Sequence, residues 1–137
     1  MSFKFEFIQK VKEIHEKALD NNLAEQKARS QAETYIKRYF DEFQTQLRKF
    51  IVNGILSIDT NKHGENSEFF KMELGQNSLS FEDSKEEKVI KVFINKEDYD
   101  RLSFNGEKMA SHKFQTELSE ELLDIYLKES FGASLGV

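Results

Sequence analysis

The fold is decided by residues 28–51, which read ARSQAETYIKRYFDEFQTQLRKFI. Apolar side chains in this stretch recur at intervals of three and four residues, as one face of a helix requires. At 100° per residue they fall within an arc of about 160°. We therefore predict an amphipathic helix that packs against the core, with Phe43 and Leu47 deeply buried. Its apolar face consists of Ala28, Ala32, Tyr35, Ile36, Tyr39, Phe40, Phe43, Leu47, Phe50 and Ile51.

The ends of this long helix are predicted from its capping residues. Asn22 can cap the helix, since Glu25 stands three residues later, in the position of a capping box. Asn53 and Gly54 supply the C-terminal end, because Gly54 can take the left-handed conformation. Asp20 and the two asparagines after it are predicted to separate this helix from one before it.

The residues before this break are predicted to form a first helix, beginning near residue 3. Their first phenylalanines alternate with charged residues, as in a strand. The alternation stops at Ile8, however, while the helical spacing continues to Leu19. Phe5 falls outside the resulting apolar face. That face consists of Phe3, Phe7, Val11, Ile14 and Ala18.

Beyond the long helix the pattern changes, and residues 55–115 are predicted to form an antiparallel sheet of four to five strands. Alternating and β-branched residues indicate the strands, and their connections are too short for parallel crossovers. Asn105 and Gly106 resemble a hairpin turn, and residues 63–66 are predicted to be another turn. Residues 95–104 fit either a helical turn or a strand. The clearest strand segments are 69–74, 79–81 and 89–94.

A C-terminal helix is predicted over about 119–131. Ser119 can cap it, and two glutamates follow in the first turn, where the helix dipole favours negative charge. Gly132 is expected to end the helix, and residues 132–137 are expected to form a frayed tail. The buried face is predicted to be Leu118, Leu122, Ile125 and Tyr126.

Together these elements predict an α+β fold. It consists of two helices over about 3–53, the second one long, a sheet over about 55–115 and a third helix over about 119–131. No Pro, internal repeat or low-complexity linker divides the sequence. Residues 1–137 are therefore predicted to be a single domain.

Charge and cysteine content exclude several classes of function. The net charge of −5 argues against nucleic acid as a partner. The absence of Cys excludes disulfides, zinc–thiolate sites and thiol nucleophiles. Nothing resembles a signal peptide or a membrane-spanning segment, so we expect a cytoplasmic protein with no membrane partner. Residues 1–56 hold ten basic and eight acidic residues, and residues 57–137 hold ten and seventeen. This acidic second half is typical of a solubilising surface or attracts a basic protein partner.

Candidate catalytic and metal-binding residues are scattered. His15, His63 and His112 are far apart in the sequence, and only His63 has carboxylates nearby, at Glu65 and Glu68. A closed metal site needs clustered ligands, so we predict no metal site and no cofactor. Adjacent acidic residues do not supply the cleft that acid–base catalysis needs, so we name no catalytic residue. The acidic pairs are Asp41-Glu42, Glu86-Glu87, Glu97-Asp98 and Glu120-Glu121.

The leading hypothesis is a non-enzymatic interaction module that forms a homodimer through its N-terminal helices. A helix over residues 23–53 would span roughly 46 Å at 1.5 Å per residue, whereas a compact domain of this length has a diameter of about 37 Å. One end must overhang, bend or be covered from outside, and Phe5 would also stay in water on a monomer. The rival interpretation is a helix that breaks near Glu33, or an elongated monomer.

Two other classes of function stay open. One is a small-molecule or lipid-binding domain, in which the helix aromatics line a pocket instead of only forming core. The other is a small enzyme whose carboxylate or histidine site is assembled only in three dimensions. A deep apolar cavity with a few polar groups would favour the first of these.

Overall fold

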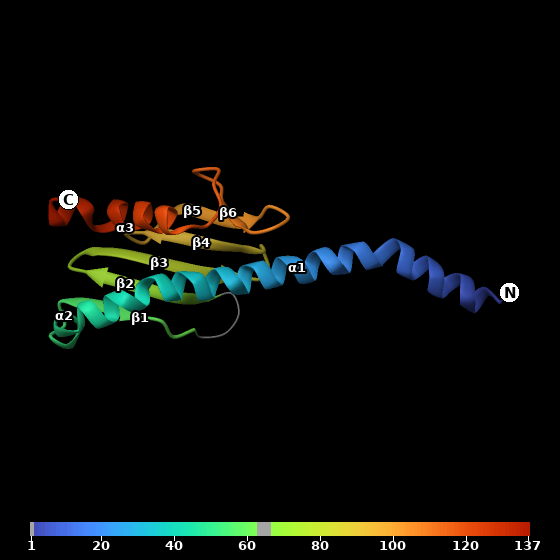
Figure 1. Cartoon of the computed structure of the whole chain (residues 1–137), viewed down its shortest axis with the longest axis horizontal. Coiled ribbons are helices and arrows are strands. Elements are labelled where there is room, and N and C mark those ends of the chain that lie inside the picture. Colours follow the sequence, from blue (N-terminus) through green and yellow to red (C-terminus); the bar gives the residue numbers. More distant parts are fainter. Residues whose placement is uncertain (1, 63–66) are drawn as a thin grey trace.

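The computed structural model describes residues 2–62 and 67–137, and a single 44-residue helix dominates it. This helix, α1, spans Phe3–Gln46, and a short helix, α2, spans Arg48–Val52. The predicted break at Asp20 is wrong, because α1 continues through it (Figure 1). The long helix is therefore the first one, and the second is short.

The polar residues in the middle of α1 do not end it. Asn22 caps no helix, and its side chain instead accepts a hydrogen bond from Lys88 Nζ at 2.8 Å. Polar residues such as Asp20 and Asn21 each lower helix stability by only about 0.7 kcal/mol relative to Ala. No Gly or Pro occurs within α1 to interrupt its backbone hydrogen bonds. A continuous helix therefore forms where the sequence pattern predicted two.

The sheet contains six antiparallel strands within the described residues, in the order β1-β2-β3-β4-β5-β6, where four to five were predicted. Residues 95–104, which fitted either a helical turn or a strand, form a tight turn and then a strand. Asn95 and Lys96 have positive φ values of 53° and 69°, as a two-residue hairpin turn requires. The hairpin predicted at Asn105 and Gly106 is confirmed between the last two strands. The strands are β1 Leu56–Asp59, β2 Glu68–Leu74, β3 Asn77–Ser84, β4 Val89–Ile94, β5 Glu97–Phe104 and β6 Met109–Ser111.

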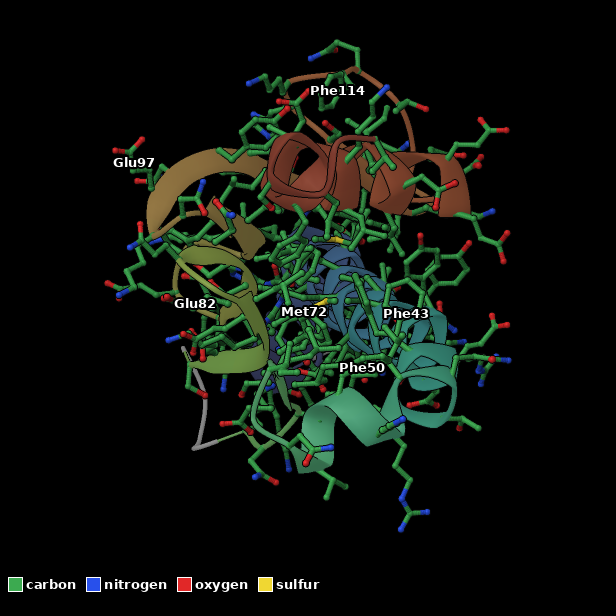
Figure 2. All side chains as sticks on the ribbon, turned by 90° about the vertical axis from the view of Figure 1, so that its left-hand side faces the viewer. Phe43, Phe50, Met72, Glu82, Glu97 and Phe114 are labelled. Carbon is green, nitrogen blue, oxygen red and sulfur yellow. The ribbon has the colours of Figure 1, made fainter. Side chains whose placement is uncertain are left out.

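Two helices cover one side of this sheet and form the core with it. They are the second half of α1 and the C-terminal helix α3, which spans Glu120–Leu135. Both lie on the same side of the sheet in Figure 2. Phe40 of α1 stacks on Phe70 of β2 with ring centres 4.3 Å apart, and Tyr126 of α3 packs against Phe81 of β3. The predicted α+β fold class is therefore confirmed.

α3 begins where predicted and ends later. Ser119 Oγ accepts a hydrogen bond from the backbone N–H of Leu122 at 3.2 Å, which confirms the predicted cap. Gly132 lies inside the helix and is buried, so the predicted helix end there and the frayed tail after it are wrong. A helical Gly costs only about 1 kcal/mol, and the burial of the neighbouring Phe131 offsets this cost. The helix ends at Gly136, whose φ of 76° is left-handed.

Several apolar side chains are less buried than predicted, including Phe50, which is exposed, and Leu118, which is half-buried. Phe43 and Leu47 are half-buried and Ile125 is exposed, whereas Ile36 and Phe40 are fully buried. Phe43 and Leu47 line a groove at the end of the core instead of its centre. The prediction that both are deeply buried is wrong, because helical spacing identifies the inward face but not how far the sheet and α3 cover it.

The first half of α1 extends away from the sheet and α3 (Figure 1). Residues 3–24 are all exposed, and Glu25 is the first buried residue of the helix. We call residues 3–21 the arm, since the helix meets Lys88 at Asn22, and we call the rest of the described chain the body. At 1.5 Å per residue the arm is about 28 Å long.

Candidate functional site

A cluster of charges with a buried centre at Glu25, Arg29 and Asp83 holds α1 where the arm leaves the body. Arg29 Nε donates to Glu25 Oε1 at 2.8 Å, and Arg29 Nη1 donates to Asp83 Oδ1 of β3 at 2.6 Å. Lys62 Nζ donates to Asp83 Oδ2 at 2.8 Å and to Glu33 Oε1 at 2.9 Å. The cluster ties consecutive turns of α1 to the sheet, and it therefore fixes the direction in which the arm projects.

The carboxylate of Asp83 accepts hydrogen bonds from both Arg29 and Lys62. Burial alone would raise its pKa, but the hydrogen bonds and positive charges of Lys62 and Arg29 outweigh the burial and lower the pKa below its ordinary value. Asp83 is therefore ionised at neutral pH. Removing one partner from such an ion-pair cluster leaves an uncompensated buried charge and destabilises the fold. The role of Asp83 is therefore to hold α1 in place on the sheet.

The arm carries an apolar stripe that nothing covers within the described residues. The exposed fractions of Phe3, Phe7 and Ile14 are 76%, 58% and 64%, and the rings of Phe3 and Phe7 lie 6.3 Å apart. Ile8 and Leu19, beside the stripe, are exposed as well. Large exposed apolar surfaces of this kind mark interaction sites. The stripe consists of Phe3, Phe7, Val11, Ile14 and Ala18, as the helical spacing predicted.

A second apolar surface lies at the opposite end of the molecule, between the C-terminal ends of α1 and α3. It is a groove of about 650 Å³ that α2 and the neighbouring ends of β1 and β2 also line. Figure 2 looks into this end of the molecule, with Phe43, Phe50 and Met72 labelled around the groove. Its walls include Phe43, Leu47, Phe50, Leu74, Leu127 and Phe131.

Two charged side chains of α3, Asp124 and Lys128, stand at the edge of this groove. Asp124 accepts a hydrogen bond from the hydroxyl of Tyr39 on α1. Burial, together with this hydrogen bond and the negative charge of Asp124, raises the pKa of Tyr39. Tyr39 is therefore a neutral donor at physiological pH, and the hydrogen bond joins the two helices beside the groove.

Asp100 of β5 is a buried carboxylate that the sequence pattern did not single out. Its Oδ2 accepts hydrogen bonds from Ser111 Oγ and from the Tyr126 hydroxyl, each at 2.5 Å. Its Oδ1 accepts from the backbone N–H groups of Arg101 at 2.7 Å and Lys113 at 2.9 Å. Burial and the hydrogen bond to Asp100 raise the pKa of Tyr126. Four donors occupy the accepting positions of this carboxylate, so the network joins β5, β6 and α3.

The histidines considered as candidate metal ligands or catalytic bases do not cluster in the part of the chain that the structure describes. His15 is exposed on the arm. His112 Nε2 lies 2.7 Å from Ser103 Oγ, in a contact between the end of β6 and β5. His63, with the turn predicted over residues 63–66, lies outside the described residues. In the part of the chain that the structure describes, no three potential ligands are close enough to hold a metal ion.

The acidic pairs lie in four different parts of the fold. Asp41-Glu42 is on α1, Glu86-Glu87 follows β3, Glu97-Asp98 begins β5, and Glu120-Glu121 forms the first turn of α3. Glu87 pairs with Lys91 at 2.5 Å. Because the pairs are separated in the fold, their arrangement does not support acid–base catalysis. The exposed stripe and the groove are therefore the surfaces from which we infer a function.

Comparison of the chain with models of protein families, with curated proteins and with solved structures finds no match. Across the described residues, no helix combines the length and the apolar character that crossing a membrane requires. The candidate site is therefore defined by geometry alone. It comprises the arm at one end of the molecule and the groove at the other.

Proposed function

We propose that this chain is a non-enzymatic protein–protein interaction module that forms a homodimer through its arm. The observation that supports the proposal is the apolar stripe of the arm. Its side chains are exposed to solvent, because no other part of the described chain packs against them. The exposed parts of the large side chains in the stripe and of Ile8 and Leu19 beside it amount to about 700 Å², at about 200 Å² for each whole side chain. This is close to the ~800 Å² that each partner buries in a stable interface.

A second copy is the partner that fits the arm most simply. An amphipathic helix is covered by another amphipathic helix laid along it, and an identical chain supplies one. Twofold dimers are also the commonest oligomers. The attachment of the arm through Arg29 supports the proposal further, because a helix that is already fixed loses less conformational freedom on binding.

Light scattering at micromolar concentration tests the homodimer. We expect a mass near twice the 16.1 kDa of one chain. Ile14→Asp places a charge in the stripe and should return the mass to that of one chain. Gln9→Asp adds the same charge on the opposite side of the helix and should leave the dimer intact. A mass of 16.1 kDa for the unmodified chain, unchanged by concentration, would refute the homodimer.

The groove between α1 and α3 favours a second candidate function, the binding of a small apolar molecule or lipid. Its volume of about 650 Å³ falls within the ~300–1,000 Å³ of small-molecule sites. Such sites are mostly apolar with a few polar groups that orient the ligand. Asp124 and Lys128 would be those groups here, at the edge of the apolar lining.

Fluorescence of an environment-sensitive apolar dye, such as anilinonaphthalene sulfonate, tests the groove. Ile55 lines the groove and is largely exposed, so Ile55→Trp would fill part of it without disturbing the core, and should weaken dye binding by about fivefold. Val52→Trp is the matched control, because Val52 is exposed on α2 outside the groove lining. Equal dye binding by the two variants would remove this candidate.

A further inference from the structure

We infer that the two arms pair antiparallel, with the twofold axis passing between Val11 and Lys12. The inference rests on the proposed homodimer and adds its orientation and register. In this register, residue n of one arm lies level with residue 23 − n of the other, so that Phe3 lies level with Asp20. The charge pattern, the apolar spacing and the free length of the arm each point to this axis.

When two copies of the arm run in opposite directions, the charges along one edge of the stripe face opposite charges on the same edge of the other copy. At 100° per residue, Glu6, Lys10, Glu13 and Lys17 fall within about 60° of one another, beside the stripe. In an antiparallel pair the same edges of the two helices face each other. Glu6 then lies level with Lys17 of the second copy, and Lys10 lies level with Glu13 of the second copy. All four positions on each arm face an opposite charge.

A parallel pair would leave Lys10 and Lys17 without acidic partners. In that arrangement the charged edge of one helix faces the other edge of the second helix. That other edge carries Lys4, Ile8, His15 and Leu19, and it has no acidic residue. Since edge charges select the orientation of paired helices, the pattern favours the antiparallel pair.

The apolar stripe interdigitates in the same register. Phe7 of one copy points between Ile14 and Ala18 of the other, and Ile14 points between Phe7 and Val11. Ala18 points between Phe3 and Phe7, and Val11 points between Val11 and Ile14. Each of these side chains therefore fills a gap in the facing stripe, as knobs fill holes in paired helices.

The free length of the arm sets the same axis independently. Residues 3–21 lie outside the body, and Lys88 meets the helix at Asn22. An axis between residues 11 and 12 passes within half a residue of the middle of this free segment, which lies at Lys12. The pair therefore uses the whole arm, and each arm tip ends where the body of the other copy begins.

The stripe supplies the attraction in this pair, and the charges select its orientation. Lys10 and Glu13 already form an exposed ion pair within one arm, at 3.3 Å. Exposed ion pairs of this kind stabilise a helix only weakly. Lys10 and Glu13 can therefore pair with the second copy at little cost to the stability of the single arm. An orientation that brought like charges together would be opposed, and the antiparallel register avoids this along the whole edge.

Single cysteines test the orientation, because the chain has no Cys of its own. Val11→Cys lies beside the axis, so mild oxidation should link two copies through this position. In Phe3→Cys the two thiols would be about 26 Å apart along the pair, at 1.5 Å per residue, which no disulfide can bridge. Oxidation should leave that variant unlinked. A parallel in-register pair predicts instead that both variants link.

Charge exchange tests which edges face each other. The double variant Lys10→Glu, Lys17→Glu has an all-acidic edge, and the double variant Glu6→Lys, Glu13→Lys has an all-basic edge. Each variant alone should dimerise at least tenfold more weakly than the unmodified chain. An equimolar mixture should recover the original affinity as a heterodimer. All substituted positions are exposed, so circular dichroism should show unchanged helix content in every variant.

The outcomes separate this inference from the proposed function. A dimer that Val11→Cys links and Phe3→Cys does not supports the antiparallel register. A dimer that Phe3→Cys links, or a mixture that recovers no affinity, overturns the register and leaves the homodimer standing. A dimer that neither cysteine links would place the arm on another surface of the second copy, such as the groove, and would also overturn the register. A monomeric chain overturns both proposals.

Discussion

The two halves of α1 share one amphipathic pattern and have opposite surroundings. Phe7 and Phe43 are thirty-six residues apart, which is about ten ideal turns, so the arm continues the face that the second half turns toward the sheet. In the second half the strands and α3 cover that face, and Ile36 is completely buried. In the arm the same face lies in water. Helical periodicity therefore identifies a face that requires a partner, and the rest of the chain decides whether one is present.

The largest difference between the halves should be the cost of emptying an aromatic site. Phe40 is 1% exposed and stacks on Phe70, so Phe40→Ala should lower the free energy of unfolding by about 3–5 kcal/mol. Phe7→Ala should change it by less than about 0.5 kcal/mol in the monomer, the usual limit for a surface substitution. Urea denaturation of dilute samples measures both. A cost above about 1 kcal/mol for Phe7→Ala would mean that the arm packs within its own chain.

Ion pairs should show the next largest difference. Arg29→Met keeps an apolar stem but leaves Glu25 and Asp83 buried without their cation, and it should cost about 3 kcal/mol. Lys62 still pairs with Asp83, which places the cost at the lower end of the range for buried pairs. Lys10→Met removes the exposed pair on the arm and should cost less than about 0.5 kcal/mol. Similar costs in chemical denaturation would contradict the contrast between a fixed body and a free arm.

The cluster at the base of the arm should also make stability depend on pH. The pKa of Asp83 is lowered in the folded chain. Its contribution to stability is therefore fully present above the ordinary aspartate pKa and is lost as the pH falls through the lowered folded pKa. The difference in unfolding free energy between the unmodified chain and Asp83→Asn should be constant near neutral pH and shrink below about pH 4. Denaturation curves at several pH values measure it, and a difference that persists unchanged to pH 3 would contradict the lowered pKa.

The sequence predicts much of the body because local spacing and turn chemistry encode it. The inward face with Ile36 and Phe40 follows from helical periodicity alone. The cap at Ser119 and the hairpin at Asn105 and Gly106 follow from residues that favour one backbone conformation. In each case the residues that decide the structure are neighbours in the sequence.

The remaining features depend on contacts between residues far apart in the chain. Asp100 falls on the inward side of β5 together with Leu102, which was the available signal that it is buried. Its donors Ser111 and Tyr126 could not be matched to it without knowing how β6 and α3 pack. The groove at Phe43 likewise depends on where the sheet and α3 stop covering α1. For the arm, the helical spacing predicted which residues form the apolar stripe. It could not predict that this stripe is exposed, because that depends on where the sheet and α3 lie.

The smallest expected effect tests the continuity of α1 between its two halves. Asn21 lies inside the helix, where Asn is less favourable than Ala by about 0.7 kcal/mol, so Asn21→Ala should slow hydrogen exchange of the amides in the following turn by about threefold. Asn53→Ala is the matched control, because Asn53 follows α2 and its side chain donates to the backbone carbonyl of Lys49 at 2.7 Å. There the substitution removes a hydrogen bond and should not slow exchange. If Asn21→Ala also failed to slow exchange, the helix would be interrupted at its polar residues. The arm would then be hinged to the body, and the Arg29 cluster could no longer fix its direction.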